Sequence, residues 1–169
     1  NANKKLNIGT TLDYIYARGE YANLAAKRFS GSLFGTYDGK KYKATAFFST
    51  NNHSHYENGG IQDTSYINGS IQYPSYNIPV NINGYANFKH NQAFYNHQYN
   101  IGIERPIRIN PDSVSMEYVP VTIFAHTVRL DDMRKRYYEQ SVEKDFYANT
   151  YLPHTETNDT ASLLKLSNR

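Results

Sequence analysis

The chain has 169 residues, of which 17 are tyrosine and 8 phenylalanine, and it contains no tryptophan and no cysteine. The lack of cysteine excludes a disulfide scaffold and a thiolate metal site, and a net charge of +3 without a long basic stripe gives no indication of nucleic-acid binding. No segment approaches the roughly 20 apolar residues that a transmembrane helix requires. Many aromatic residues favour strands, and many Asn, Gly and Ser residues favour turns, so the composition predicts an all-β fold.

The first predicted element is a strand at residues 5–17, KLNIGTTLDYIYA. Successive side chains of a strand point to opposite faces. Leu6, Ile8, Leu12 and Tyr14 therefore share one face, while polar residues such as Asn7 and Asp13 share the other.

A β-hairpin is predicted next, with strands at residues 29–37 and 42–50. The connection at 38–41, DGKK, is a tight-turn signal because Asp-Gly supplies the backbone conformations that short hairpins need. The apolar row of this hairpin includes Leu33 and Phe48, and Lys43 lies opposite it.

Residues 51–91 show no sustained periodicity, so we expect a long loop, and such loops are usually functional or mobile. Its first part contains a Gly pair that permits a tight turn. We expect this part either to narrow a pore or to form a recognition surface, or else only to shape the start of the loop. The candidate residues are Glu57, Asn58, Gly59, Gly60 and Asp63.

Alternation returns at residues 93–103 and again at 118–130, with a turn region predicted at 105–117. On the first of these strands Tyr99 and Ile101 fall opposite Asn96, Gln98 and Asn100. On the second, Val121 and Ile123 are expected to share the apolar face. Residues 161–169, ASLLKLSNR, could open a sixth strand.

The faces opposite the apolar rows carry mostly Asn, Gly, Ser, Thr and Gln, as a water-filled lumen tolerates, whereas strands of soluble proteins usually carry charge there. Short and long connections alternate, and tyrosines lie near strand ends, both of which are typical of outer-membrane barrels. We therefore predict an antiparallel meander forming part of a transmembrane outer-membrane β-barrel. The residues expected to face lipid are Leu6, Ile8, Leu12, Tyr14, Leu33, Phe48, Tyr99, Ile101, Val121 and Ile123, and those expected to line the pore are Asn7, Asp13, Lys43, Asn96, Gln98 and Asn100.

Five or six strands are fewer than the about eight that close a barrel. We therefore expect residues 1–169 to be one partial barrel domain of a longer wall. If the 38–41 turn is periplasmic, the loop at about 51–91 is extracellular.

Three segments, NKKLNIGTTLDYIYARGEYAN (3–23), YENGGIQDTSYI (56–67) and YVPVTIFAHTVRL (118–130), together resemble the putative porin family of Bacteroidetes outer membranes. The resemblance implies an outer-membrane β-barrel with short periplasmic turns and extracellular loops. It implies neither a catalytic residue set nor a particular solute.

Other chemistry finds little support in the sequence. His53 and His55 form an isolated His-x-His, although metal sites need convergent ligands, and no nucleophile elbow accompanies the Ser, His and Asp residues. We expect no catalytic residue, no metal and no cofactor.

The predicted function is passive diffusion of small solutes through a porin-like barrel in a bacterial outer membrane. The expected partners are outer-membrane lipid, small solutes and other outer-membrane proteins, with no nucleic acid. Two alternatives remain open: a soluble extracellular or periplasmic β-sandwich that binds glycans with its tyrosines, and the barrel portion of a TonB-dependent transporter.

Overall fold

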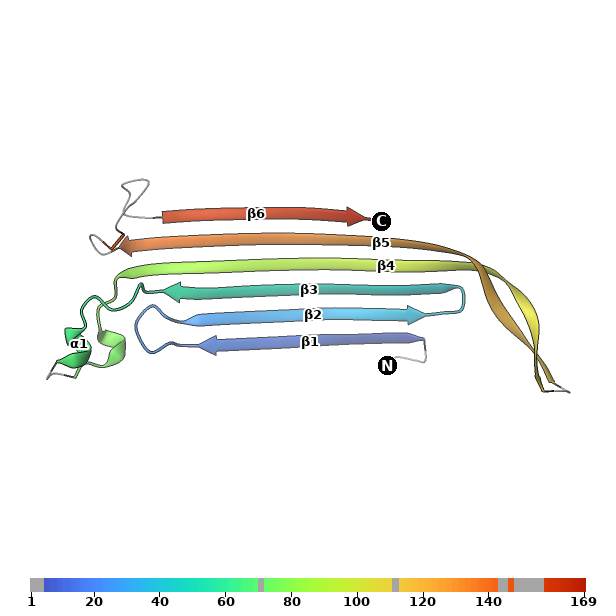
Figure 1. The fold of residues 1–169 in the computed structure, drawn as a ribbon, viewed down its shortest axis with the longest axis horizontal. Helices are drawn as coiled ribbons and strands as arrows, with labels where there is room; N and C mark the ends of the chain where they lie inside the picture. Colours follow the sequence, from blue (N-terminus) through green and yellow to red (C-terminus); the bar gives the residue numbers. More distant parts are fainter. Residues whose placement is uncertain (1–4, 70–71, 111–112, 143–145, 148–156) are drawn as a thin grey trace.

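The structure is a computed structural model that describes residues 5–69, 72–110, 113–142, 146–147 and 157–169. Within these residues, six strands form one antiparallel sheet in which each strand pairs with its sequence neighbours (Figure 1). The predicted all-β meander and its hairpin at 29–50 are therefore confirmed. The strands are β1 (Leu6–Ala17), β2 (Ala26–Asp38), β3 (Tyr42–Glu57), β4 (Ile82–Asn110), β5 (Ser113–Val142) and β6 (Thr157–Asn168).

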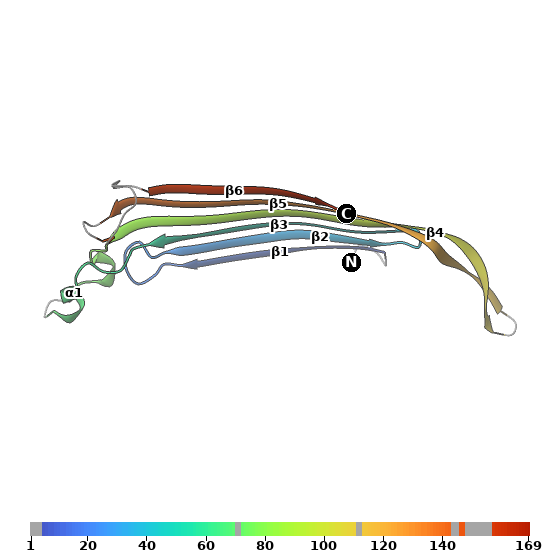
Figure 2. The ribbon, with the colours of Figure 1, turned by 45° about the horizontal axis from the view of Figure 1, so that its top comes forward.

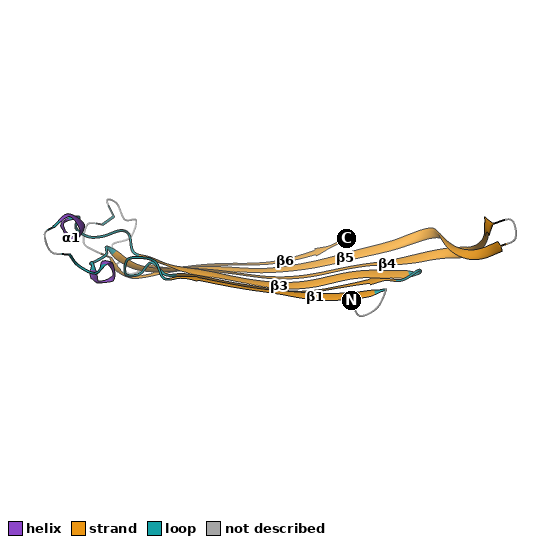
Figure 3. Ribbon diagram, turned by 90° about the horizontal axis from the view of Figure 1, so that it is seen from below, coloured by secondary structure: helices purple, strands orange, loops and turns teal. Residues whose placement is uncertain are grey.

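The sheet is a single, long, gently curved layer (Figure 2). A short helix α1 (Ser65–Asn68) and a 3-10 turn η1 (Ser75–Asn77) lie at one end (Figure 3), and the β4–β5 hairpin extends beyond the other strands at the opposite end. No helix in the described part of the chain is long and apolar enough to cross a membrane.

The pairing register gives the sheet two chemically different faces. Directly opposed residues of an antiparallel pair project to the same side, so each register row can be followed across all six strands. We call one side the apolar face and the other the polar face. Two adjacent rows define them: Thr10, Leu33, Phe48, Ala93, Leu130 and Leu166 on the apolar face, and Thr11, Ser32, Ser49, Gln92, Asp131 and Lys165 on the polar face.

The strands are longer than their alternation predicts. β3 continues to Glu57 and β4 begins at Ile82, so the connection expected at 51–91 covers only 58–81. The turn expected at 105–117 is also wrong in extent, because β4 runs to Asn110 and β5 resumes at Ser113; the tip at 111–112 lies outside the described residues. In these extensions both faces are polar or mixed, so the sequence shows no apolar alternation there. Backbone hydrogen bonds to the neighbouring strand stabilise the extended segments instead.

The predicted apolar row of β5 is wrong. Ile123 lies opposite Asn100, which places it on the polar face, and Phe124 lies opposite Tyr99 on the apolar face. Val121 falls in a β-bulge, where the register shifts as β4 passes from Ile101 to Gly102. In the 118–130 segment, odd-numbered and even-numbered positions both carry apolar residues. Only the pairing with β4 therefore decides which of these residues lie on the apolar face.

The sheet has no second layer packed on it among the described residues. There, Ile78 and Ile82 are the only buried hydrophobic side chains, and both lie near the helical end. Large side chains on the apolar face remain open, as Leu12 shows with a relative exposure of 75%. The outer edges of β1 and β6 likewise carry no strand partner in the described part of the chain. The fold therefore leaves its apolar face and both edges to be covered by something else.

Candidate pore-lining face

All six residues predicted to line a pore lie on the polar face. Asn7 and Asp13 are opposite Thr36 and Ser30, and the other four stand on the paired strands β3 and β4. They are spread along the sheet and do not converge on one point. Lys43 is paired with Asp38 at 2.9 Å, and Asn96 donates to the Thr127 hydroxyl at 2.6 Å.

Asn100 on β4 has a structural role beside the start of β3. Its side chain is buried, its backbone N–H donates to the Lys41 carbonyl at 2.7 Å, and its own carbonyl accepts from the Tyr118 hydroxyl at 2.7 Å. Gln98 donates to its side-chain oxygen at 2.6 Å. Asn100 therefore ties the 38–41 turn to β4 and β5.

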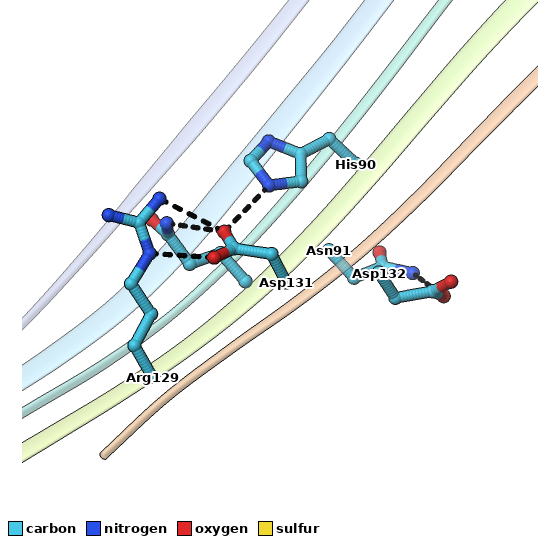
Figure 4. Close-up of polar contacts among 6 residues, drawn as sticks. His90, Asn91, Arg129, Asp131 and Asp132 are labelled. Atoms are coloured by element: carbon cyan, nitrogen blue, oxygen red, sulfur yellow. Dashed lines mark hydrogen bonds and ion pairs between the residues drawn. The ribbon is translucent and has the colours of Figure 1, made fainter. Parts of the chain in front are cut away.

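A cluster of side chains around one buried carboxylate, that of Asp131, lies in the middle of the polar face and was not predicted from the sequence. Asp131, 2% exposed, accepts from Arg129 Nε and Nη2 at 2.7 and 3.1 Å and from Gln92 Nε2 at 2.8 Å (Figure 4). His90 Nε2 lies 3.1 Å from the same carboxylate. The neighbouring Asp132 projects to the apolar face. Only the Arg-x-Asp spacing of 129 and 131 hints at this cluster in the sequence, and its two partners on β4 are about 40 residues away along the chain.

An aromatic row crosses the polar face next to this cluster. Phe34, Phe47 and Phe94 occupy one register row, which continues to Arg129 on β5 and Ser167 on β6. The rings of Phe47 and Phe94 are stacked with centroids 5.1 Å apart. Gly9 completes the row on β1, and a Cβ there would overlap the Phe34 ring, so glycine makes room for that ring.

A groove of about 330 Å³ runs beside the aromatic row on the polar face. It combines one aromatic ring with three cationic side chains, which suits an anionic or ring-bearing solute. Its lining consists of Phe94, Thr127, Arg129, Lys165, Ser167 and Arg169.

Eight of the ten residues predicted to face lipid lie together on the apolar face, the exceptions being Val121 and Ile123 as described above. The apolar side chains form a band oblique to the register rows. One register row shows this. It carries apolar-band residues on β1 and β2, namely Tyr14 and Phe29, but cationic residues on β4 and β5, namely Lys89 and Arg134. The apolar band is thus displaced along the strands by about one residue from each strand to the next, as expected for strands tilted by about 35–45° in a barrel wall.

The height of the band agrees with a bilayer. On β4 the apolar residues run from Ala93 to Ile103, and at about 3.4 Å per residue and a tilt of about 40° this spans roughly 26 Å, against about 25 Å for barrel proteins. Aromatic side chains also contact one another within the band. Tyr42 at the start of β3 and Tyr95 on β4 share a hydrogen bond of 2.6 Å, and His97 stacks on Tyr95 with ring centroids 5.2 Å apart.

Comparison with known proteins gives the same assignment as this geometry. A family model described as putative porin matches residues 1–169, the whole chain. The chain belongs to the putative porin family. Searches of curated proteins and of solved structures found no match. The resemblance inferred from the sequence is confirmed at the level of this family.

In this porin-family chain the Glu57–Gly60 segment shapes the start of the β3–β4 loop. Gly59 and Gly60 have positive φ angles of 64° and 87°, which other residues rarely adopt. The buried Asn58 side chain donates to the Ala22 carbonyl at 3.0 Å and accepts from the Gly60 N–H at 2.9 Å. Glu57 lies 2.7 Å from His55 Nε2 on the polar face.

Asp63 begins the turn into α1. Its side-chain oxygen accepts from the backbone N–H of Ser65 at 2.8 Å, and this bond lowers the pKa of the Asp63 carboxyl. Asp63 and Glu57 therefore each have a local partner. No group of three or more His, Cys, Asp or Glu residues in the described segments could hold a metal ion.

A second buried carboxylate lies at the loop end of the polar face. Glu139, 1% exposed, accepts from the hydroxyls of Tyr137 at 2.9 Å and Tyr147 at 3.1 Å. Burial and the Glu139 carboxylate raise the pKa of the Tyr147 hydroxyl. Phe146 approaches Gly59 closely, so residues 146–147 contact both the polar face and the β3–β4 loop.

We expect Asn58→Ala to loosen the loop end of the sheet by about 1–3 kcal/mol, because it leaves the Ala22 carbonyl and the Gly60 N–H without their partner. Limited proteolysis of the folded protein should show faster cleavage in residues 58–81. Gln62→Ala, which removes an exposed bond to the Val80 carbonyl, is the matched control and should have a smaller effect. Equal cleavage of both variants would contradict the anchoring role of Asn58.

Proposed function

We propose that the chain forms part of the wall of an outer-membrane β-barrel in a Bacteroidetes bacterium, with its polar face towards a water-filled lumen. In this arrangement the apolar face meets lipid, and small polar solutes pass by passive diffusion. The observation that carries the proposal is the separation of the two faces over a band of bilayer height, in a chain of the putative porin family.

A soluble glycan-binding sandwich is not favoured by this geometry. A sandwich buries one face of each sheet against a second sheet, whereas the described strands form one sheet whose apolar face is open. Exposed contiguous apolar surface of this extent indicates a membrane or partner contact. No observation in the structure favours the barrel of a TonB-dependent transporter.

The orientation follows from connection lengths. The β2–β3 turn occupies only 39–41, whereas the connections at the other end include 18–25 and 58–81. Short turns are periplasmic in outer-membrane barrels, so the helical end with α1 is extracellular and the β4–β5 hairpin is periplasmic.

The first test is migration of the full-length protein, taken from a membrane fraction, on a detergent gel before and after boiling. A closed barrel migrates differently when it is unfolded by heat, and conductance in planar bilayers should then follow. Recovery of the protein in the soluble fraction, without a heat-dependent shift, would contradict the proposal.

The groove on the polar face gives a second prediction. Lys165→Gln combined with Arg169→Gln removes two lumen cations, so the chloride-to-potassium permeability ratio should fall. Reversal potentials under a salt gradient measure this ratio. Lys27→Gln with Arg105→Gln removes the same charge from outside the polar-face groove and should leave the ratio unchanged; an equal fall in both variants would contradict a lumen role for the groove.

A further inference from the structure

A cluster of cations lies on the apolar face, on the loop side of the apolar band. Lys89, Arg134 and Arg136 project there from the adjacent strands β4 and β5. Lys27 on β2 lies in the same row as Arg136, three strands away from it. All four side chains are exposed. Among the described residues, Asp132 is the one carboxylate beside them on this face. This local excess of positive charge contrasts with the polar face, where the central Asp131 is bonded to Arg129.

The cations surround a groove of about 260 Å³. Its lining includes Lys89, Arg134 and Arg136 together with the amide of Asn87 and the hydroxyl residues Thr160 and Ser162. A volume just below the about 300 Å³ of ordinary ligand pockets suits a headgroup-sized anion. Guanidinium, ammonium, amide and hydroxyl donors are the groups that bind phosphate oxygens.

The cations are largely available to a ligand. The contact between Arg134 Nε and the Asp132 carboxylate is long, at 3.3 Å, and the Arg134 side chain is 69% exposed. In the described part of the chain, neither Lys89 nor Arg136 has a carboxylate within 4.0 Å. The Arg136 guanidinium lies 5.8 Å from the Tyr138 ring, a contact that leaves its N–H donors open to a ligand.

The position of the cluster decides the kind of ligand. Lys89 and Arg134 each lie four residues beyond the ends of the apolar band at Ala93 and Leu130, which is about 10 Å above it for a strand tilted by about 40°. The headgroup layer is about 5–8 Å thick on each side of the hydrocarbon core, and Lys and Arg extend their charged ends over such distances. On the outer surface of a barrel this site adjoins lipid headgroups.

We propose that Lys89, Arg134 and Arg136 bind the phosphate of a lipid headgroup in the outer leaflet. The proposal rests on the membrane orientation under the proposed function. Basic pockets at the membrane interface bind anionic headgroups in this way. Asn87, Thr160 and Ser162 supply neutral donors around the same phosphate.

The test uses the full-length protein in detergent micelles and measures bound lipid by native mass spectrometry. The probe is bis-phosphorylated lipid A, compared with the dephosphorylated form that carries the same acyl chains, and with inorganic phosphate alone. The triple variant Lys89→Gln, Arg134→Gln, Arg136→Gln should lower the affinity for phosphorylated lipid A at least about tenfold. Arg28→Gln, Arg105→Gln, Arg108→Gln removes equal charge elsewhere and is the matched control.

The outcomes separate the site from the barrel. Loss of phosphorylated lipid A from the triple variant alone, with both variants still shifting on heating, supports the site. Three results would overturn the site while leaving the barrel intact. In the first, the triple variant and its control bind phosphorylated lipid A equally. In the second, the protein binds phosphorylated and dephosphorylated lipid A equally, and in the third, inorganic phosphate competes with equal affinity. A parent protein that shows no heat-dependent shift overturns the proposed function and this site together.

Discussion

Leu12→Arg in the full-length protein is expected to impair barrel assembly, with a loss of about 2–4 kcal/mol in folding free energy. Leu12 lies near the middle of the apolar band on β1, and its relative exposure of 75% means that contacts with the described residues do not explain its apolar character. An arginine at this position would have to enter the hydrocarbon core. The measurement is urea unfolding in lipid vesicles, together with the fraction of protein that shows a heat-dependent shift.

Thr11→Arg is the matched control because Thr11 is adjacent in sequence but lies on the polar face, opposite Ser32. A charge there enters the aqueous lumen, so we expect an effect of less than about 1 kcal/mol. If Leu12→Arg assembles as well as Thr11→Arg, the apolar face is not in contact with lipid. An aqueous sheet would give that result, since an exposed leucine can be replaced at little cost.

Gly102→Ala is expected to destabilise the junction between the sheet and the β4–β5 hairpin by about 1–3 kcal/mol. Gly102 lies at the bulge, and a Cβ there would overlap the Val119 carbonyl oxygen and lie 2.8 Å from Pro120 Cα. Because these are backbone atoms, the strand itself must move to accept a methyl group. Guanidinium unfolding and protease sensitivity of residues 102–120 measure the effect.

Gly35→Ala serves as the control for this prediction. Its added Cβ would lie 3.7 Å from the Asn7 carbonyl, which is ordinary van der Waals contact. We expect a change within about 0.5 kcal/mol. Similar unfolding of the two alanine variants would mean that the bulge tolerates a side chain and does not depend on glycine.

Local alternation was sufficient where one face of a strand is apolar and the other polar. The 5–17 segment has this property, so Leu12 and Asn7 were placed on the correct opposite faces without knowledge of any partner strand. The DGKK segment similarly gave the position of the turn in the first hairpin, because β2 ends at Asp38 and β3 begins at Tyr42. Alternation failed at 118–130, where Val121, Ile123 and Phe124 are all apolar and the bulge removes the simple period of two.

Strand ends could not be read in the same way. β3 and β4 continue through His53 and Phe88, which are opposite each other, although their neighbours are polar on both sides. Interstrand hydrogen bonds hold these extensions, and such bonds depend on a partner that is distant in sequence. The loop expected from the missing periodicity is therefore longer than the loop in the structure.

The sequence by itself determined the all-β class, the approximate positions of the strands and the two-faced character of the first four, because each of these depends on residues within one strand. Only the tertiary structure decided which distant side chains meet. It brought His90 and Gln92 to Asp131, aligned Phe47 with Phe94, and gathered Lys89, Arg134 and Arg136 around one groove. These contacts join different strands, so they depend on the pairing register, which no single segment contains.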